Sequence, residues 1–507
     1  MHFPERHIRR SIFLASALLL AACSSLKPVE LSPEYTPAPT AAALWTTLAE
    51  ERPGDWYVLL NDGPAALDWR LRAIDSATES IDLQTFLWTV DTVGSLALDH
   101  LVAAAERGVT VKLLVDDSFL LGKDDILLEL VSHPNIEYRI YNPYKRRSDN
   151  VVARQALNLA EFHRLDHRMH NKAMIVDNRV AIVGGRNLAD EYFGLHAVAN
   201  FRDLEVIVGG PIVLDVSAEF DSYWNDRWAV PIESLSHVRH TPADLDAARM
   251  VREENVHIHA EQTDAERLVA WREQVANAFD GKGTLFADRP PEENPAEAGE
   301  APVQVANALM AMIDAASEEV LIVSAYLIPT PELEGAVRRA VERGVRIRML
   351  TNSIRSNNHL TAHSAYRNHI RTLLDSGAEL HEVRIDATDR DIYMLSPIEE
   401  KKLALHAKAL VIDNDKVFIG SANLDPRSLR INTEMGLLIE STALNADVRK
   451  AVTPDFSKTN AWQLELDEED HVVWVSHDVT LTEQPAGSVM QRIEDWFFSH
   501  LPIEDEL

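Results

Sequence analysis

Short apolar runs alternate with longer segments of helical character along most of the chain. The runs at 110–115, 173–176, 346–350 and 409–412 predict buried β-strands, because short apolar runs bounded by polar or turn residues are typical of strands covered on both faces. Two of them follow a glycine that closes a predicted helix, at Gly108 and Gly344. Helices alternating with short strands predict an α/β fold with largely parallel or mixed sheets.

The same order of elements occurs twice. Residues 74–81 parallel residues 313–320. Residues 106–109 parallel residues 342–345, and this second pair is separated by 236 residues (342 minus 106). We therefore expect two duplicated α/β domains that pack together, over residues 51–240 and 301–507, the second with a C-terminal extension. The charged, proline-bearing stretch 241–300 is the predicted connection between them.

The N-terminus reads as an export signal over residues 1–22, with a basic start and the apolar run 11–22. Leu20-Ala21-Ala22-Cys23 resembles the bacterial lipobox, and Cys23 is the one cysteine among 507 residues. We expect lipidation at Cys23, a proline-bearing tether over 23–50, and a location in the cell envelope, anchored at the periplasmic side of a membrane. An ordinary secretory signal or a plain membrane anchor is the alternative.

Acidic residues outnumber basic ones, 80 against 49, which gives a formal charge of −31. Such a surface repels polyphosphate backbones and lacks the cationic excess that drives non-specific nucleic-acid binding. Nucleic acid is therefore not expected as a partner.

Both halves carry the same polar residues at the same spacing. The first set is His170, Lys172, Asp177 and Asn187, and the second is His406, Lys408, Asp413 and Asn423. In each set the asparagine follows the histidine by 17 residues, and the sets are again 236 residues apart (406 minus 170). Strand residues two apart point to one face, so each histidine shares a face with its lysine.

A histidine beside a lysine is a poor metal site, because an ammonium group has no lone pair and repels a cation. We expect no metal or other cofactor. The pair suits phosphate chemistry, which needs a nucleophile, donors for the phosphate oxygens and an acid for the leaving alcohol. One set supplies a histidine nucleophile, the other a histidine acid, and the lysines and asparagines supply donors. Two sets make one site, at the interface between the halves.

The paired His-x-Lys-x4-Asp motifs resemble those of the phospholipase D superfamily. The flanking sequences 168–172, 184–187, 405–408, 418–428 and 432–436 resemble bacterial cardiolipin synthases of the C type, and the similarity runs from Trp56 to Trp474. The resemblance implies a phosphatidyl-histidine intermediate on His170, with His406 as the acid, although the reverse assignment stays open.

The resemblance also implies that an acid orients each histidine. Glu434 matches the family's position, and Asp203 is its looser counterpart. The motif aspartates, Asp177 and Asp413, lie beyond the buried strands and are expected to tie the following turn.

The implied reaction transfers a phosphatidyl group to phosphatidylglycerol and forms cardiolipin, with phospholipids and a membrane surface as partners. A hydrolytic phospholipase D differs only in the attacking molecule and remains an alternative. A nuclease or other phosphodiesterase is disfavoured by the charge. A non-catalytic, lipid-binding envelope lipoprotein is disfavoured by the intact motifs.

Three features outside the motifs have alternative interpretations. The basic stretch 145–168 either attracts anionic headgroups or is a solvated loop. His257 and His259 favour an exposed edge strand over a metal site. The aromatic segment 489–501 favours a docked terminal helix whose aromatics face a core, with a helix in a membrane interface as the alternative.

Overall fold

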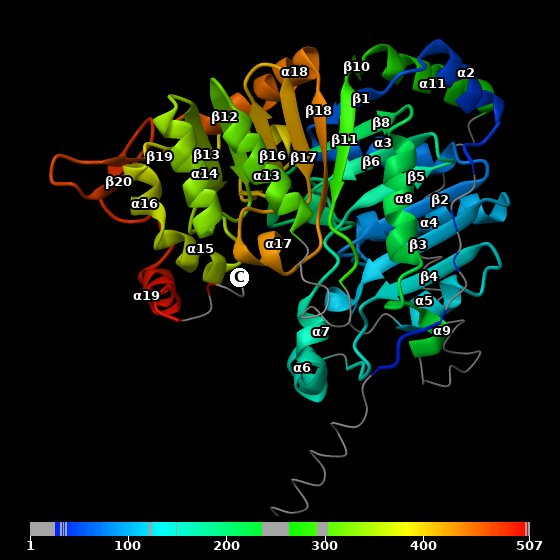
Figure 1. Cartoon of the computed structure of the whole chain (residues 1–507). Helices are drawn as coiled ribbons and strands as arrows, with labels where there is room; N and C mark the ends of the chain where they lie inside the picture. Colours follow the sequence, from blue (N-terminus) through cyan, green and yellow to red (C-terminus); the bar gives the residue numbers. More distant parts are fainter. Residues whose placement is uncertain are drawn as a thin grey trace, which may run out of the picture.

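The computed structural model describes residues 26–30, 33, 35, 38–120, 124–148, 150–235, 263–291, 303–501, 504 and 507. The predicted signal peptide, Cys23, and the pair His257 and His259 lie outside these residues. Two large sheets lie side by side, each with helices packed on it (Figure 1). Within the described parts of the chain, no helix combines the length and the apolar character needed to cross a bilayer.

The first sheet has nine strands in the order β10-β1-β8-β6-β5-β2-β3-β4-β9. They are β1 (Trp56–Leu60), β2 (Ser80–Thr85), β3 (Thr110–Asp116), β4 (Ile136–Tyr141), β5 (Ala173–Val176), β6 (Val180–Gly184), β8 (Glu205–Gly209), β9 (Ala229–Pro231) and β10 (Phe279–Asp280). Strands β2, β3 and β4 are parallel, whereas β5 pairs antiparallel with both β2 and β6. The sheet is therefore mixed.

The second sheet has ten strands in the order β11-β18-β17-β16-β12-β13-β14-β19-β20-β21. They are β11 (Lys282–Ala287), β12 (Glu319–Ser324), β13 (Arg346–Asn352), β14 (Glu379–Val383), β16 (Lys408–Ile412), β17 (Lys416–Gly420), β18 (Met435–Glu440), β19 (Ala461–Leu466), β20 (Val472–Val475) and β21 (Thr480–Leu481). The run β18-β17-β16-β12-β13-β14 repeats β8-β6-β5-β2-β3-β4, with the same parallel and antiparallel pairings. The expected duplicated α/β fold is confirmed.

Helices cover the sheets of both halves (Figure 1). In the first half they are α2 (Ala43–Glu51), α3 (Gly63–Asp75), α4 (Thr92–Glu106), α5 (Asp124–Leu130), α6 (Val151–Leu157), α7 (Phe162–Asp166), α8 (Val213–Trp224), α9 (Ile232–Leu235) and α11 (Asp264–Ala276). In the second half they are α13 (Gln304–Ala315), α14 (Pro331–Glu342), α15 (Leu360–Arg367), α16 (Ile370–Asp375), α17 (Pro426–Arg430), α18 (Thr442–Val452) and α19 (Val489–Phe498).

The apolar pattern placed the central strands correctly. The predicted run 173–176 is β5, with all four residues buried, and the run 409–412 lies in β16. Helices α4 and α14 both end two residues before a glycine with positive φ, +96° at Gly108 and +88° at Gly344. Glycine adopts this left-handed conformation without the steric cost of a Cβ atom, so both helices turn into their next strand here.

The two halves share one interface. Strand β7 (Ala199–Arg202) of the first half pairs in parallel with β15 (Lys402–Leu405) of the second. One core cluster contains Val206 and Phe220 from the first half together with Ile419 and Leu437 from the second. Burial of apolar surface across this contact holds the halves together as a single body.

Part of the predicted tether is folded. Residues 43–51 form α2, and the indole of Trp45, 2% exposed, donates a 2.7 Å hydrogen bond to Asp177. The prolines at 28–39 led to the prediction of a tether through residue 50, although the apolar residues that dock α2 begin at Leu44.

Candidate active site

The backbone at each motif histidine is held by the opposite half. His170 lies just before β5, and its amide donates to the carbonyl of Thr433 at 2.9 Å. His406 lies just before β16, and its amide donates to the carbonyl of Arg202 at 2.8 Å. Both side chains are more than nine-tenths buried. The interface between the halves therefore fixes the position of both imidazoles.

The carboxylates that orient the histidines are also exchanged between halves. Nδ1 of His170 lies 2.8 Å from Oε2 of Glu434, and Nδ1 of His406 lies 2.6 Å from Oδ2 of Asp203. Both carboxylates are fully buried. The sequence placed Glu434 after His406 and Asp203 after His170, but each acid contacts the histidine of the other motif.

Burial lowers the pKa of both histidines, and the neighbouring lysines lower it further, to about 4 for His170 and about 3 for His406. Burial opposes ionisation of the two acids, but the contacts with histidine and lysine keep their pKa values below the ordinary range. The free site therefore holds neutral imidazoles against ionised carboxylates. A neutral imidazole that donates from Nδ1 presents the lone pair of Nε2 to a ligand.

Each motif lysine contacts the backbone of its own motif histidine. Nζ of Lys172 donates to the carbonyl of His170 at 2.6 Å, and Nζ of Lys408 donates to the carbonyl of His406. Burial lowers the pKa of Lys172 to about 7 and that of Lys408 to about 8, although both acids oppose the shift. An anionic phosphate placed here would favour the ammonium form of both side chains.

The motif asparagines differ in their contacts. The amide of Asn187 donates to the hydroxyl of Tyr192 at 2.9 Å and accepts from the amide of Leu87 at 3.2 Å. The buried Oδ1 of Asn423 has no hydrogen-bond partner among the described residues. Asn423 also lines the cavity that His170 lines.

The motif aspartates lie at the far end of β5 and β16. Asp177 accepts hydrogen bonds of 2.7 to 2.8 Å from the amides of Thr78, Glu79 and Ser80. Asp413 accepts the equivalent hydrogen bonds from the three backbone amides of residues 317–319 in the second half. Both therefore tie the loop before a central strand, β2 or β12, rather than the turn that follows them. We assign them a structural role.

The residues behind the two acids differ, which sequence reasoning missed. Ser421 Oγ donates to Glu434, whereas the equivalent position, 236 residues earlier, is Gly185. A Cβ atom at Gly185 would lie 2.2 Å from Oδ1 of Asp203. The glycine leaves room for the shorter acid, and the serine braces the longer one. The 236-residue offset between the motifs could have revealed this difference, because it aligns Gly185 with Ser421.

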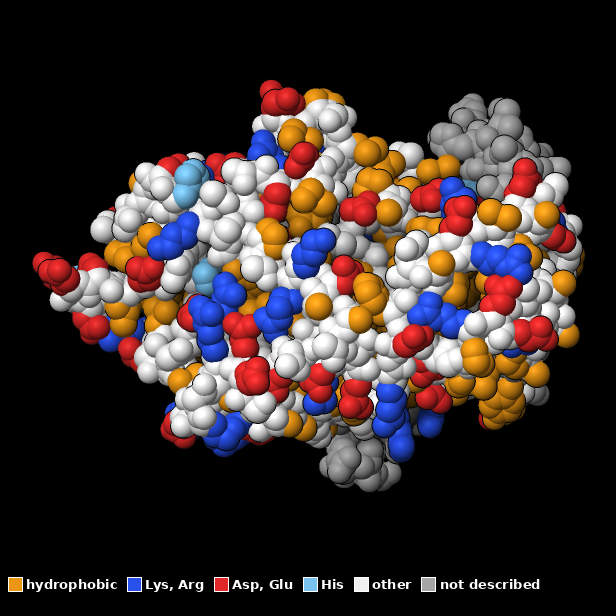
Figure 2. All heavy atoms as spheres, turned by 90° about the horizontal axis from the view of Figure 1, so that it is seen from above, with side chains coloured by type: hydrophobic (Ala, Val, Ile, Leu, Met, Phe, Trp, Pro, Cys, Tyr) orange, Lys and Arg blue, Asp and Glu red, His pale blue; other side chains and the backbone are white. Residues whose placement is uncertain are grey.

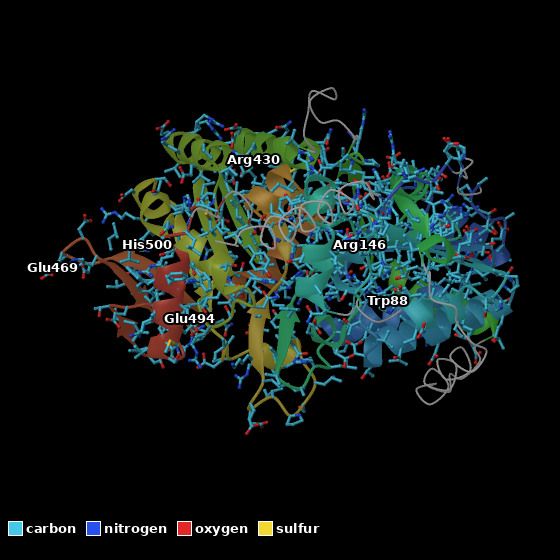
Figure 3. All side chains as sticks on the ribbon, turned by 90° about the horizontal axis from the view of Figure 1, so that it is seen from below. Trp88, Arg146, Arg430, Glu469, Glu494 and His500 are labelled. Carbon is cyan, nitrogen blue, oxygen red and sulfur yellow. The ribbon has the colours of Figure 1, made fainter. Side chains whose placement is uncertain are left out.

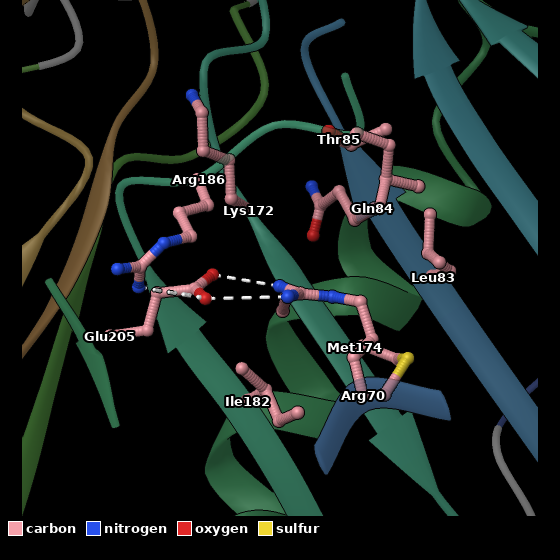
Figure 4. A pocket seen from close by; sticks show the side chains of 11 residues that line it. Arg70, Leu83, Gln84, Thr85, Lys172, Met174, Ile182, Arg186 and Glu205 are labelled. Atoms are coloured by element: carbon pink, nitrogen blue, oxygen red, sulfur yellow. Dashed lines mark hydrogen bonds and ion pairs between the residues drawn. The ribbon is translucent and has the colours of Figure 1, made fainter. Parts of the chain in front are cut away.

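A buried charge network supports β6 behind the first motif (Figure 4). Glu205 lies between two guanidinium groups, with Arg70 at 2.7 Å and Arg186 at 3.3 Å. Arg186 also donates to the carbonyl of Asp203 at 2.8 Å. The arginine of the Gly-Gly-Arg-Asn sequence therefore fixes the backbone of the acid that holds His406.

A cavity of about 630 Å³ opens beside His170. Apolar and polar side chains both line it: Phe86, Phe119, Tyr144, Leu159, Phe162, Leu165, Tyr326, Ala362, Arg168, His359, Asn423 and Arg427 are among them. Phe86 packs edge-on against the His170 ring at 4.9 Å between centroids. This lining suits an amphiphile whose polar group reaches the histidine.

Most of the basic stretch before the first motif is neutralised internally. Arg147 pairs with Asp117 and Asp124 at 2.7 Å, and Arg154 lies 3.3 Å from Asp117. Arg168 lies 3.6 Å from Asp116 and lines the cavity. The stretch is thus neither a simple solvated loop nor a free cationic patch, because these arginines pair with buried or partly buried aspartates beside the cavity.

The described residues contain no cluster of three or more histidine, cysteine, aspartate or glutamate side chains that could hold a metal ion.

Comparison with known proteins identifies the family. A family model described as "Cardiolipin synthase, PLD-like domain" matches residues 71–224 and 309–455. The chain is 34% identical to cardiolipin synthase C of Escherichia coli K12, over 92% of this chain and 99% of that protein. It is 26% identical to cardiolipin synthase B of the same strain, over 78% of this chain and 79% of that protein.

Among solved structures, phosphatidylserine synthase of Haemophilus influenzae Rd KW20 aligns with a TM-score of 0.52 at 14% identity. The alignment covers 83% of this chain and 92% of that one, which supports the shared fold. With the duplicated sheets, the paired motifs and the matched family model, the chain belongs to the cardiolipin synthase family with phospholipase D-like domains.

Proposed function

We propose that the protein is a phosphatidyltransferase that forms cardiolipin by transferring a phosphatidyl group to phosphatidylglycerol. The observation that carries the proposal is the pair of buried histidines, each held at Nδ1 by a carboxylate of the opposite half, beside an amphipathic cavity. The family and the similarity to cardiolipin synthase C support phospholipids as substrates.

In the first step, Nε2 of His170 attacks the phosphorus of a phospholipid, and the bond from phosphorus to the headgroup alcohol breaks. His406 gives the proton of its Nε2 to the departing oxygen, which leaves as a small alcohol. The negative phosphodiester raises the pKa of His406 on binding and so favours the protonated form that this step requires.

In the second step, a hydroxyl group of phosphatidylglycerol attacks the phosphohistidine. His406 takes the hydroxyl proton, the bond between phosphorus and Nε2 of His170 breaks, and cardiolipin is released. The donors for the phosphate oxygens are Lys172, Lys408, Asn187 and Asn423. Asp203 and Glu434 stabilise the imidazolium forms. The steps use no metal or other cofactor.

Attack of a lipid alcohol on the phosphohistidine gives cardiolipin, whereas attack of water gives hydrolysis. The cavity beside His170 is large and partly apolar, so a second lipid headgroup can approach the phosphohistidine there. Binding of that headgroup excludes water and favours transfer.

Location in the envelope is part of the proposal. Lipidation of Cys23 would hold the protein at the periplasmic side of a membrane, and the acidic surface disfavours nucleic acid as a substrate. Mass spectrometry of the mature N-terminus tests the lipid on Cys23.

The test of the reaction is to incubate the purified protein with labelled phosphatidylglycerol and phosphatidylethanolamine, separately and together, in the presence of EDTA. Cardiolipin as the product supports the proposal, whereas phosphatidic acid alone would show a hydrolase. Substitution of His170 by alanine should abolish both products and the labelled adduct that alkaline detergent quenching preserves on the protein.

A further inference from the structure

The C-terminal helix α19 docks through a polar residue. Asp495 is its fully buried side chain and accepts from Nδ1 of His363 and Oγ of Ser364, both at 2.9 Å, and from Arg367 at 3.0 Å. All three partners lie on α15. The contact is a charged hydrogen-bond cluster, which is specific in geometry and needs no apolar face.

The apolar face of α19 points outward instead. Val489, Met490, Ile493, Trp496 and Phe497 are 53 to 70% exposed, and their spacing places them on one side of the helix. The expectation that the aromatics face a core is wrong, because the cluster around Asp495 occupies the inward side. Five large apolar side chains on one exposed stripe indicate a surface that has a partner.

A second exposed apolar surface lies across the active-site mouth. Leu157 of α6, Leu159 of the short helix η2 (Leu159–Glu161) and Phe162 of α7 are 49 to 67% exposed. Leu159 and Phe162 also line the cavity beside His170, as does the C-terminal Leu507. This surface is therefore continuous with the substrate cavity.

Both surfaces face the same way. Figure 1 shows α19 and the pair α6 and α7 as two projections at the bottom of the molecule, with the C-terminus between them. Figure 3 views this face and labels Glu494 on α19, His500 just after it and Arg146 near the centre. Acidic and basic side chains are scattered over the opposite face (Figure 2). The apolar projections and the cavity thus share one side of the protein.

The N-terminal part of the chain reaches the same corner. The amide of Leu26 donates a 3.0 Å hydrogen bond to Glu161 at the end of η2. Cys23 precedes Leu26 by three residues, a reach of about 10 Å at most. The first described residues therefore lie close to the exposed side chains of Leu159 and Phe162.

We propose that the exposed stripe of α19 and the exposed side chains of α6, η2 and α7 form one membrane-docking face. Helix α19 lies in the plane of the bilayer interface, and the cavity opens toward the headgroups between the two surfaces. This inference deepens the proposed function, because it assigns the surface that delivers lipid to the site.

A phospholipid surface fits this face better than a second copy of the chain. The cavity is lined by residues of α7 and of α15, the helix on which α19 docks, so a protein bound across both surfaces would cover the site. A bilayer at this position supplies the substrate. Arg146, whose amide is held by Asn158 at 3.0 Å, adds a cation near anionic headgroups.

The first test uses the full-length protein in vesicles of phosphatidylglycerol and phosphatidylethanolamine (about 1:3) that carry brominated acyl chains. The fluorescence of Trp496 is obtained as the difference between the protein and its Trp496→Phe variant. We expect bromine to quench this component strongly relative to plain vesicles. Equal intensity in both kinds of vesicle would overturn the proposal.

The second test compares a double variant, Ile493→Glu with Trp496→Glu, against the control Val269→Glu. Val269 lies on α11 and is 53% exposed, as Ile493 is. We expect cardiolipin formation from vesicles to fall by about tenfold or more in the double variant, since each charge opposes insertion. Activity on monomeric short-chain phosphatidylglycerol should stay unchanged, and the control should match the parent.

Equal loss on vesicles and monomers would contradict the docking face. So would a sedimentation mass that halves in the double variant while vesicle activity persists, because the stripe would then join two copies of the chain. If Trp496 is quenched but no cardiolipin forms from either substrate, the proposed function fails and the docking face stands.

Discussion

The exchanged carboxylates lead to a sharp prediction about the roles of the histidines. Replacement of Asp203 by asparagine removes the negative charge 2.6 Å from Nδ1 of His406, and Glu434→Gln does the same for His170. Two unit charges with centres ~4 Å apart attract by roughly 4 kcal/mol at an effective dielectric constant of about 20. Loss of that attraction toward the imidazolium slows the reaction about a thousandfold.

The assay separates attack from proton donation. A phosphatidyl ester with a p-nitrophenol leaving group needs no protonation of the departing oxygen. In a single turnover, we expect Asp203→Asn to release p-nitrophenol from this ester at nearly the parent rate, as His406→Ala does, whereas Glu434→Gln remains slow. The adduct on the protein, quenched in alkaline detergent, should form fast in the first variant and slowly in the second.

Two outcomes would refute this reasoning. If the ester rescues Glu434→Gln rather than Asp203→Asn, His170 is the acid and His406 the nucleophile. If Asp203→Asn behaves like a His170 variant in every assay, the exchange of acids between halves does not govern the chemistry.

Three further results are expected from the geometry. Asp177→Ala should lower the free energy of unfolding by about 3 kcal/mol or more, because it leaves the buried indole of Trp45 and the buried amide of Ser80 without their acceptor. Asp413→Ala, whose partner amides are more exposed, should lower it by about 1 kcal/mol in the same denaturant titration. Gly185→Ala should reduce kcat well over tenfold, since the new methyl group collides with the carboxylate of Asp203. A Gly185→Ser variant with the parent kcat would contradict this steric explanation. With a pKa of about 7, Lys172 loses its ammonium as pH rises, so kcat/KM should fall more steeply above about pH 7 than below it, and Lys172→Arg should remove that extra slope.

The sequence was sufficient for the fold and for the meeting of the motifs. The four-residue apolar runs inside the two motifs predicted β5 and β16. The offset of 236 residues between the motifs indicated two similar halves. Pairing of His170 with Glu434 could not be predicted, because the two residues are 264 positions apart and their contact depends on how the sheets pack.

Local patterns misled where a distant polar partner decided the outcome. Aromatics at helical spacing usually face a core, but in α19 the buried position is Asp495, whose partner His363 is 132 residues away. Likewise, Arg147 reads as a surface cation until Asp117, 30 residues earlier, is seen to pair with it. Charge complementarity over such separations leaves no periodic signal.

The exchange of acids between halves has a consequence for how such an enzyme can diversify. In a pair of identical chains with one motif each, any change to the acid or to the residue behind it would occur at both histidines at once. Here both histidine sites are encoded in one chain. The pair Asp203 and Gly185 could therefore diverge in sequence from the pair Glu434 and Ser421. Each histidine can therefore be tuned separately, one for attack and one for proton transfer, although neither half holds a complete catalytic unit.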